Sequence, residues 1–196
     1  MVEHAIRNWV QGSARSLMRR LGLGLGLGLG FGLCLALGLM ASPVAAQSYE
    51  AGRQAYISGD YAEAAQIWRV MAGQGDASSR YSLGFLFEQG QGVSRDLSKA
   101  AYWYELAARQ GYALAQGNLG TLLAKGTGVP KNLVQAYAWT VLAASAYSNW
   151  ESQQKEHALL NRDWIAGRMS AKELAEAKAM AIQWRVGEPL RPVPAK

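Results

Sequence analysis

The chain has 196 residues, of which half are apolar, and its formal net charge is +6 at neutral pH. The first 46 residues hold four of the 20 Lys and Arg residues and one of the 14 Asp and Glu residues, so the part from Gln47 on has a net charge of only +3. This excess is too small and too scattered for a nucleic-acid-binding protein. The single cysteine, Cys34, excludes an internal disulfide framework.

The N-terminal segment, residues 1–46, predicts a secretory signal peptide. Arg19-Arg20 precedes an apolar run, Leu21 to Met40, which is followed by small residues that end at Ala46. We expect cleavage after Ala46, which leaves Gln47 as the first residue. The alternative is an uncleaved inner-membrane anchor through Leu21 to Met40, since 20 residues can just span a bilayer. The many glycines in the run favour cleavage, because each adds almost no apolar surface.

Residues 49–75 predict a first helical pair with a short turn. The turn is Ser58-Gly59-Asp60, and Asp60-x-x-Glu63 has the spacing of an N-terminal capping box. Helix pairs with short connections pack as antiparallel neighbours, so this segment forms the first unit of an all-α protein.

A second unit, residues 76–111, is repeated at a spacing of 36 residues in a third unit, residues 112–147. The first helix of the second unit spans about 77 to 89 and ends at the turn Gly90-x-Gly92, because glycine reaches a positive φ at little cost. Asp96 and its counterpart Asn132 are predicted N-caps of the second helices. Gly84 and Gly120 lie within the first helices, where we expect a neighbouring backbone to approach closely. A fixed period of this length is typical of a solenoid, whose units bury their apolar faces by stacking.

Residues 148–186 predict a cap for the solenoid. One helix is expected over 148–166, and Ser170-x-x-Glu173 opens another, whose Leu174, Ala177, Ala181 and Trp184 form an apolar seam. The last residues, 187–196, are rich in proline and are expected to form a disordered tail.

The motif from Tyr81 to Asp96, followed by Lys99-Ala100, Trp103-Tyr104 and Ala107-Ala108, closely resembles the Sel-one-like repeat (SLR). This family belongs to the tetratricopeptide-repeat superfamily, and the resemblance covers about Tyr49 to Tyr147. It implies an α/α solenoid, a right-handed superhelix, that is used for protein–protein interaction. Secreted bacterial members are similar to adaptors and regulators in the periplasm. We therefore expect a periplasmic or secreted protein that acts as a non-catalytic scaffold.

Candidate partner-binding residues are those on the first helix of each unit that lie off the buried stripe. They are Arg53, Tyr81, Phe85, Glu88 and Thr121. Exposed aromatic side chains in a concave groove commonly anchor a peptide or helix. The alternative for Tyr81 and Phe85 is that they pack against the preceding unit. By contrast, five tryptophans are predicted to face the core: Trp68, Trp103, Trp139, Trp164 and Trp184.

No catalytic, cofactor-binding or metal-binding residues are predicted. Ser152-x-x-Lys155 matches the nucleophile spacing of penicillin-interacting enzymes, but their partner motifs are absent from the sequence. His157 is the only histidine beyond the N-terminal segment, and a structural role is expected for it. The partner is expected to be a protein or peptide bound by a monomer, with no nucleic acid and no membrane after cleavage. The alternative function is an envelope enzyme or binding protein that acts on peptidoglycan or β-lactams; one disulfide-rich branch of the family has been linked to β-lactams, but its cysteine pairs are missing here.

Overall fold

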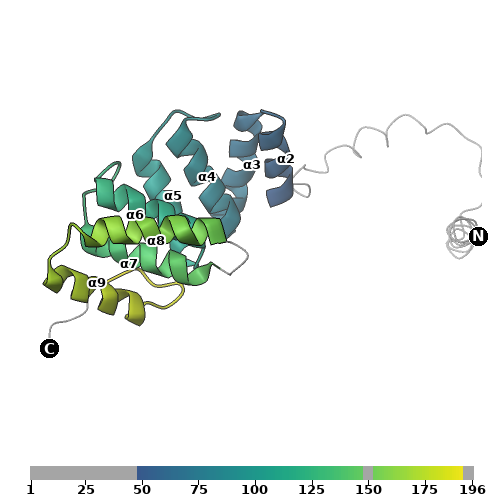
Figure 1. Cartoon of the computed structure of the whole chain (residues 1–196). Coiled ribbons are helices and arrows are strands. Elements are labelled where there is room, and N and C mark those ends of the chain that lie inside the picture. Colours follow the sequence, from purple (N-terminus) through teal and green to yellow (C-terminus); the bar gives the residue numbers. More distant parts are fainter. Residues whose placement is uncertain (1–47, 148–151, 192–196) are drawn as a thin grey trace, which may run out of the picture. The chain divides into compact units, whose positions relative to one another are not determined.

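The computed structural model describes residues 48–147 and 152–191. All described residues belong to one compact unit. The predicted signal peptide lies outside the described residues. Within them, the chain forms eight helices and no strand (Figure 1). The helices are α2 (Tyr49–Ile57), α3 (Tyr61–Gly73), α4 (Ala77–Gln89), α5 (Leu97–Arg109), α6 (Ala113–Lys125), α7 (Leu133–Ala146), α8 (Ser152–Ala166) and α9 (Ala171–Gln183).

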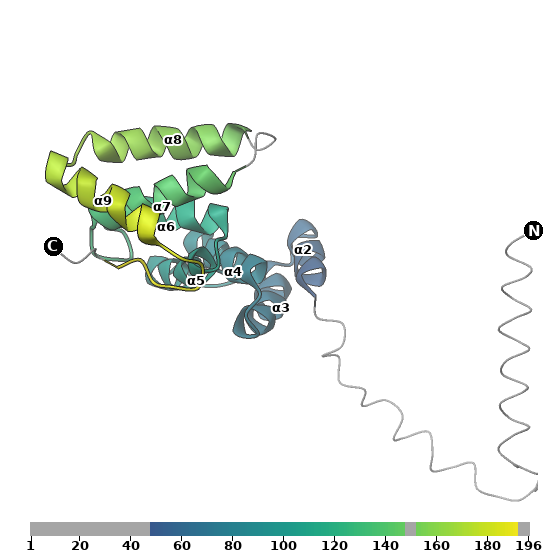
Figure 2. The same ribbon diagram turned by 90° about the horizontal axis from the view of Figure 1, so that it is seen from below.

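Helices α2 to α7 form three consecutive pairs, each packed on the next (Figures 1 and 2). The closest packing is within the pairs α2–α3, α4–α5 and α6–α7, and α3 and α5 also pack on the first helix of the following pair. This arrangement confirms the predicted all-α solenoid. In the described part of the chain, no helix is long and apolar enough to cross a membrane.

The ends of the helices are fixed by the residues that the sequence predicts. The side chains of Asp60, Asp96 and Asn132 each accept a hydrogen bond from the backbone N–H three residues on, at 2.9 to 3.0 Å. At α9, Ser170 and Glu173 make both bonds of the capping box. Gly90 and Gly126 end α4 and α6 in the left-handed conformation, with φ of 72° and 70°.

Glycines allow close contact both within and between the helix pairs. A Cβ atom on Gly84 would lie 2.8 Å from Cδ1 of Tyr104, and one on Gly120 would lie 2.6 Å from Oγ1 of Thr140. Gly52 meets the ring of Trp68 in the same way. These contacts confirm the close approach expected at Gly84 and Gly120. Between pairs, the turn residues Gly92 and Gly128 lie against the backbone at the first residue of α3 and of α5 respectively.

The tryptophans only partly follow the prediction that all five are core residues. Trp68 and Trp139 are buried, whereas Trp103 and Trp184 are half-buried. The prediction is wrong for Trp164, which is 44% exposed. In α8 the core position belongs to the neighbouring Ile165, which is fully buried, so the indole of Trp164 points outward and stacks under the guanidinium of Arg168 at 3.8 Å.

In α5 the fully buried aromatic residue is Tyr104 and not its neighbour Trp103, which was predicted to face the core. Tyr104 is fully buried, and it is the residue that meets Gly84. Adjacent residues of a helix point about 100° apart, so Trp103 lies at the edge of the buried stripe. Ala107 and Ala108 are buried as predicted.

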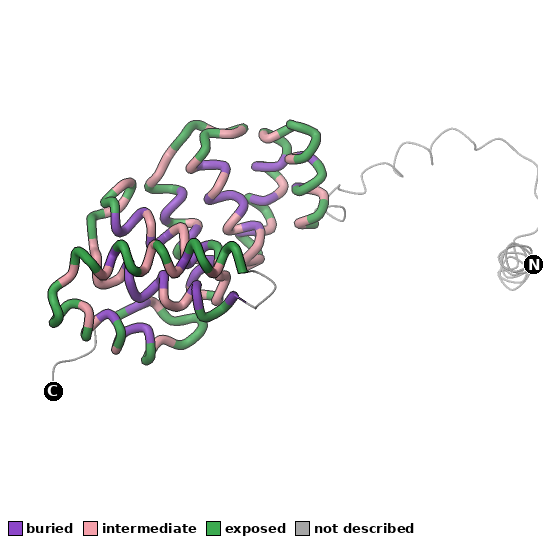
Figure 3. The backbone as a smooth tube through the Cα atoms, in the orientation of Figure 1, coloured by how far each residue is buried: buried purple, intermediate pink, exposed green. Residues whose placement is uncertain are grey.

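The two last helices both pack on α7 rather than mainly on each other (Figure 2). Most of α8 is exposed or half-buried (Figure 3). The predicted seam of α9 is formed, with Ala177 and Ala181 buried and Leu174 and Trp184 packed against the core.

The beginning of the segment that was expected to be a disordered tail packs on the solenoid. The N–H of Gly187 donates to the carbonyl oxygen of Arg109 at 2.6 Å. Leu190 is only 8% exposed and belongs to the hydrophobic core. Residues 192–196 lie outside the described part.

We expect Gly84→Leu to lower the free energy of unfolding by about 3 kcal/mol, because the larger side chain must separate α4 from α5. The matched control is Gly117→Ala in α6, where a Cβ atom would meet only Cβ of Ala143 at 3.9 Å. That substitution should leave stability unchanged or raise it by up to about 1 kcal/mol. Urea unfolding followed by circular dichroism measures both. Equal stability of Gly84→Leu and the wild type would contradict the role of this contact.

Candidate binding surface

The first helices α2 and α4, together with Trp68 of α3, line a small open cavity with aromatic walls. Its volume is about 200 Å³. Its lining consists of Tyr49, Arg53, Tyr56, Trp68, Tyr81, Ser82 and Phe85. The structure thus brings together three of the five predicted partner-binding residues: Arg53, Tyr81 and Phe85.

The walls of this cavity hold each other in place. The ring of Tyr56 lies 5.9 Å from that of Trp68 and 6.5 Å from that of Phe85, measured between centroids. The ring of Tyr49 stacks on Trp68, whose Nε1–H donates to the carbonyl oxygen of Tyr49 at 3.2 Å. Aromatic pairs at these distances are favourable and restrict rotation, so the cavity is preformed. Tyr49 and Tyr56 were missed as site residues, although the repeat register could have found them: they stand in the same positions relative to Gly52 as Tyr81 and Glu88 do relative to Gly84.

Arg53 lies exposed at the rim of the cavity. Its guanidinium forms a salt bridge of 2.6 Å with Glu50 in the previous turn of α2. The hydrogen bond with Arg53 holds the pKa of the Glu50 carboxyl below its usual value. Exposed pairs of this kind contribute little to stability, so the guanidinium can exchange Glu50 for a carboxylate of a partner.

Tyr81 and Phe85 are both half-buried. The sequence left open whether they face a groove or pack against the preceding unit, and only Phe85 packs on that unit. Tyr81 packs within its own and the following unit, with ring centroids 5.7 Å from Tyr104 and 5.1 Å from Tyr112. Burial raises the pKa of the Tyr81 phenol to about 12. Phe85 packs on Tyr56 of the preceding unit. Both rings therefore support the fold and also line the cavity.

Glu88 lies outside this cavity and has an internal hydrogen-bond partner. One of its carboxylate oxygens accepts a bond of 2.6 Å from the hydroxyl of the buried Tyr104. Burial, followed by this bond, places the pKa of Tyr104 far above its ordinary value.

Thr121 lines a second cavity, of about 330 Å³, between α6 and α8. Its hydroxyl donates to the carbonyl oxygen of Gly117 at 3.0 Å and accepts a bond of 3.0 Å from Nδ2 of Asn161. The exposed His157 also lines this cavity, together with the amides of Asn118 and Gln154. Asn161 and Gln154 could not be placed here from sequence, because the position of α8 is set by its packing on α7.

Two of the helix pairs coincide with repeats of a known protein family. A family model for the Sel1 repeat matches residues 77–112 and 113–148. These two segments contain the pairs α4–α5 and α6–α7. The chain therefore contains two Sel1 repeats. Its first pair, α2–α3, lies outside the matched segments but has the same glycine contact, between Gly52 and Trp68.

Two solved structures are similar to this chain. A protective antigen of uropathogenic Escherichia coli that displays an SLR fold has a TM-score of 0.62 and 28% sequence identity, over 69% of this chain and 28% of that one. A Sel1 repeat protein from Oxalobacter formigenes has a TM-score of 0.50 and 26% identity, over 71% of this chain and 63% of that one. The chain therefore spans less than two thirds of either. It matches no curated protein.

Ser152 and Lys155, which match the nucleophile spacing of penicillin-interacting enzymes, do not line the aromatic cavity. Ser152 is exposed at the start of α8, and Lys155 is half-buried one turn later. Among the described residues, there is no group of three or more His, Cys, Asp or Glu side chains that could hold a metal ion.

Proposed function

We propose that the protein is a non-catalytic scaffold of the bacterial cell envelope, which as a monomer binds a protein or peptide on the surface formed by α2, α4 and α6. The Sel1 repeats support the general part of this proposal, because proteins of this family generally serve as protein–protein interaction scaffolds. The predicted signal peptide supports export, and the alternative remains an anchor through Leu21 to Met40.

The cavity between α2 and α4 is the observation that carries the binding proposal. At about 200 Å³ it is smaller than the usual sites for small molecules, which begin at roughly 300 Å³. This size suits one side chain of a peptide. An apolar side chain fits the aromatic walls, while Arg53 at the rim can pair with a carboxylate of the same peptide.

Export predicts that the protein isolated from the cell envelope begins at Gln47. N-terminal sequencing together with intact mass measures this directly. Recovery of the complete 196-residue chain from the membrane fraction would instead support the anchor.

We expect the double substitution Arg53→Glu and Phe85→Ala to abolish capture of the partner from envelope extract. Phe85→Ala removes one wall of the cavity, and Arg53→Glu reverses the charge at its rim. Tyr81 is left unchanged because it packs on Tyr104 and Tyr112. The measurement is an affinity pull-down followed by mass spectrometry, with thermal unfolding to show that the variant is folded.

The matched control for this variant is Gln54→Glu, an exposed change on α2 beside Arg53 that does not line the cavity. It should capture the partner as the wild type does. A folded double variant that still captures the same protein would show that this surface is not the binding site.

The competing function, action on β-lactams, predicts covalent labelling by a fluorescent penicillin. We expect no labelled band after denaturing electrophoresis, either for the wild type or for Ser152→Ala. A band that is present in the wild type and lost in Ser152→Ala would establish Ser152 as a nucleophile and overturn the non-catalytic proposal.

A further inference from the structure

Two grooves beside the second helices are copies of one another, one repeat apart. The later groove, about 240 Å³, lies along α5 and α7; the earlier groove, about 580 Å³, lies along α3 and α5. Five lining residues of the later groove are Glu105, Leu123, Val129, Gln135 and Trp139. The earlier groove has, 36 residues before each of these, Arg69, Phe87, Val93, Lys99 and Trp103.

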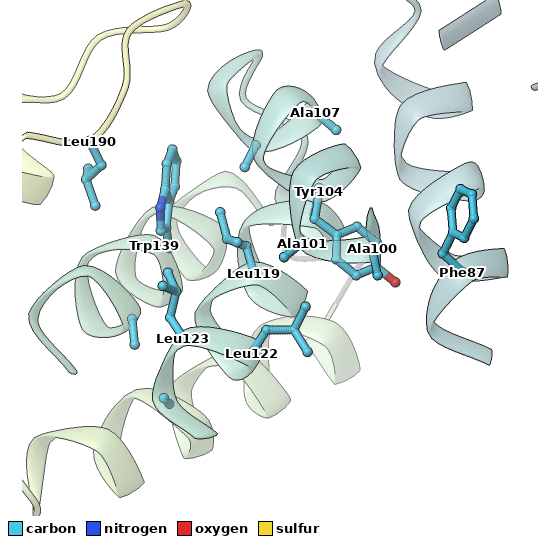
Figure 4. Packing of buried hydrophobic residues seen from close by; sticks show 14 of the residues in the cluster. Phe87, Ala100, Ala101, Tyr104, Ala107, Leu119, Leu122, Leu123, Trp139 and Leu190 are labelled. Carbon is cyan, nitrogen blue, oxygen red and sulfur yellow. The ribbon is translucent and has the colours of Figure 1, made fainter. Parts of the chain in front are cut away.

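The later groove contains a segment of the chain itself. Leu190, from the stretch that follows α9, lines it and lies beside the indole of Trp139 (Figure 4). Trp139 is 3% exposed, and the ring of Trp184 covers it further at 5.6 Å. Two hydrogen bonds hold the segment: the N–H of Gly187 donates to the carbonyl oxygen of Arg109, and the guanidinium of Arg109 donates to the carbonyl oxygen of Gly187 at 3.3 Å. An irregular chain segment with an aliphatic side chain therefore occupies this type of groove.

The earlier groove also has a tryptophan at its floor, but none of the described segments of the chain occupies it. Within the part of the chain that the structure describes, its lining comes only from α3, α4, α5 and the turn between α4 and α5. Trp103, the counterpart of Trp139, is half-buried, and the adjacent Tyr102 is 56% exposed. The rings of these two residues meet edge to face at 5.1 Å. Aromatic surface of this kind, next to charged groups, is typical of a binding site.

The charge of the lining differs between the two grooves. Where the later groove has Glu105 and Gln135, the earlier one has Arg69 and Lys99. The ammonium group of Lys99 pairs with Asp96 at 2.9 Å and lies 5.5 Å above the ring of Phe87. Arg69 is exposed and belongs to none of the salt bridges among the described residues. The earlier groove is therefore suited to a segment that carries a carboxylate.

We propose that the groove along α3 and α5 binds an irregular segment of a partner protein, with an aliphatic side chain over Trp103 and an acidic residue beside it at Arg69. The chain's own segment around Leu190 is the template for this occupant. This groove and the cavity between α2 and α4 have no lining residue in common. The test of this proposal is therefore independent of the test of the function proposed above.

The test uses two synthetic peptides based on residues 186–191: Val-Gly-Glu-Pro-Leu-Arg, which is the chain's own sequence, and Val-Gly-Glu-Pro-Leu-Glu. Each is titrated into the isotope-labelled protein while the indole N–H resonances are followed. We expect saturable shifts at Trp103 and about threefold to fivefold tighter binding of the peptide that ends in Glu, as one exposed ion pair provides. Added salt should reduce this preference, because it screens exposed charges.

Two variants and one control locate the site. Arg69→Glu should reverse the preference between the two peptides. Trp103→Ala should remove the binding of both, which is followed in this variant by the backbone amide resonances of α3 and α5. The control, Glu105→Arg, makes the same type of charge reversal 36 residues later and should leave binding at Trp103 unchanged. Unfolding curves show whether each variant is folded.

Three outcomes would overturn the proposal. The first is no saturable shift of Trp103 at millimolar peptide, and the second is an unchanged preference in folded Arg69→Glu. The third is a dimer that is seen by sedimentation and lost in Leu190→Ala, since the occupant would then be the tail of a second copy. Shifts confined to the indole of Trp139 would show that the peptides only displace the chain's own tail, which also counts against the site.

Discussion

The contact between a glycine of the first helix and a side chain of the second holds each helix pair together. Gly52 meets Trp68, Gly84 meets Tyr104 and Gly120 meets Thr140. Because the glycine has no side chain, the two backbones come close enough for the opposite side chain to cover the glycine directly. The rotation of each first helix about its axis is thereby fixed. Residues three positions before and one position after the glycine then occupy equivalent positions in every unit: Tyr49, Tyr81 and Gly117 in one row, and Arg53, Phe85 and Thr121 in the other.

The nature of the candidate binding surface follows from these two rows. In the first two units the rows contribute Tyr49, Tyr81 and Phe85, and the aromatic cavity forms between them. In the third unit the same rows contribute Gly117 and Thr121, and the lining beside α8 is rich in hydroxyl and amide groups instead. The surface therefore changes from aromatic to polar along the solenoid although the helices repeat. The loss of the aromatic side chains at these two positions and the amides of Gln154 and Asn161 in α8 together produce this change, and none of these residues takes part in the glycine contact.

The sequence predicts those features of the fold that depend on residues close together in the chain. The turn glycines Gly90 and Gly126 and the caps Asp96 and Asn132 act within one helix end, and all were predicted. The period of 36 residues is enough to predict the stacking of units. The period does not show which of two adjacent aromatic residues in a helix faces the core. For this reason Trp103 was expected in the core position that Tyr104 occupies. Similarly, Trp164 was misplaced because α8 packs on α7 outside the repeat pattern.

The site was predictable only as far as the repeat register extends. Arg53, Tyr81 and Phe85 share a cavity because register places them on one surface, but the bond from Asn161 to Thr121 joins residues 40 positions apart and has no local signal. The packing of Leu190 was missed for a related reason. Its neighbourhood is rich in proline, which by composition indicates a disordered tail, yet one leucine on the large apolar surface of Trp139 gains the free energy of burying a complete side chain.

The segment around Leu190 also shows how a short solenoid is closed at one end and left open elsewhere. Trp103 and Trp139 occupy the same position in successive repeats. The helix pairs alone do not cover the whole apolar surface of their indoles. At Trp139 this surface is covered by Trp184 and Leu190, so the C-terminal cap is a helix followed by an irregular segment that fills the last groove. At Trp103 the helix pairs offer no equivalent segment, and Arg69 takes the place of Glu105 at the edge. Position 69 lies outside the buried stripe of α3, so its charge can change without cost to packing. A repeated groove can thus serve the chain's own stability in one unit and become selective for an external, acidic segment in the unit before it.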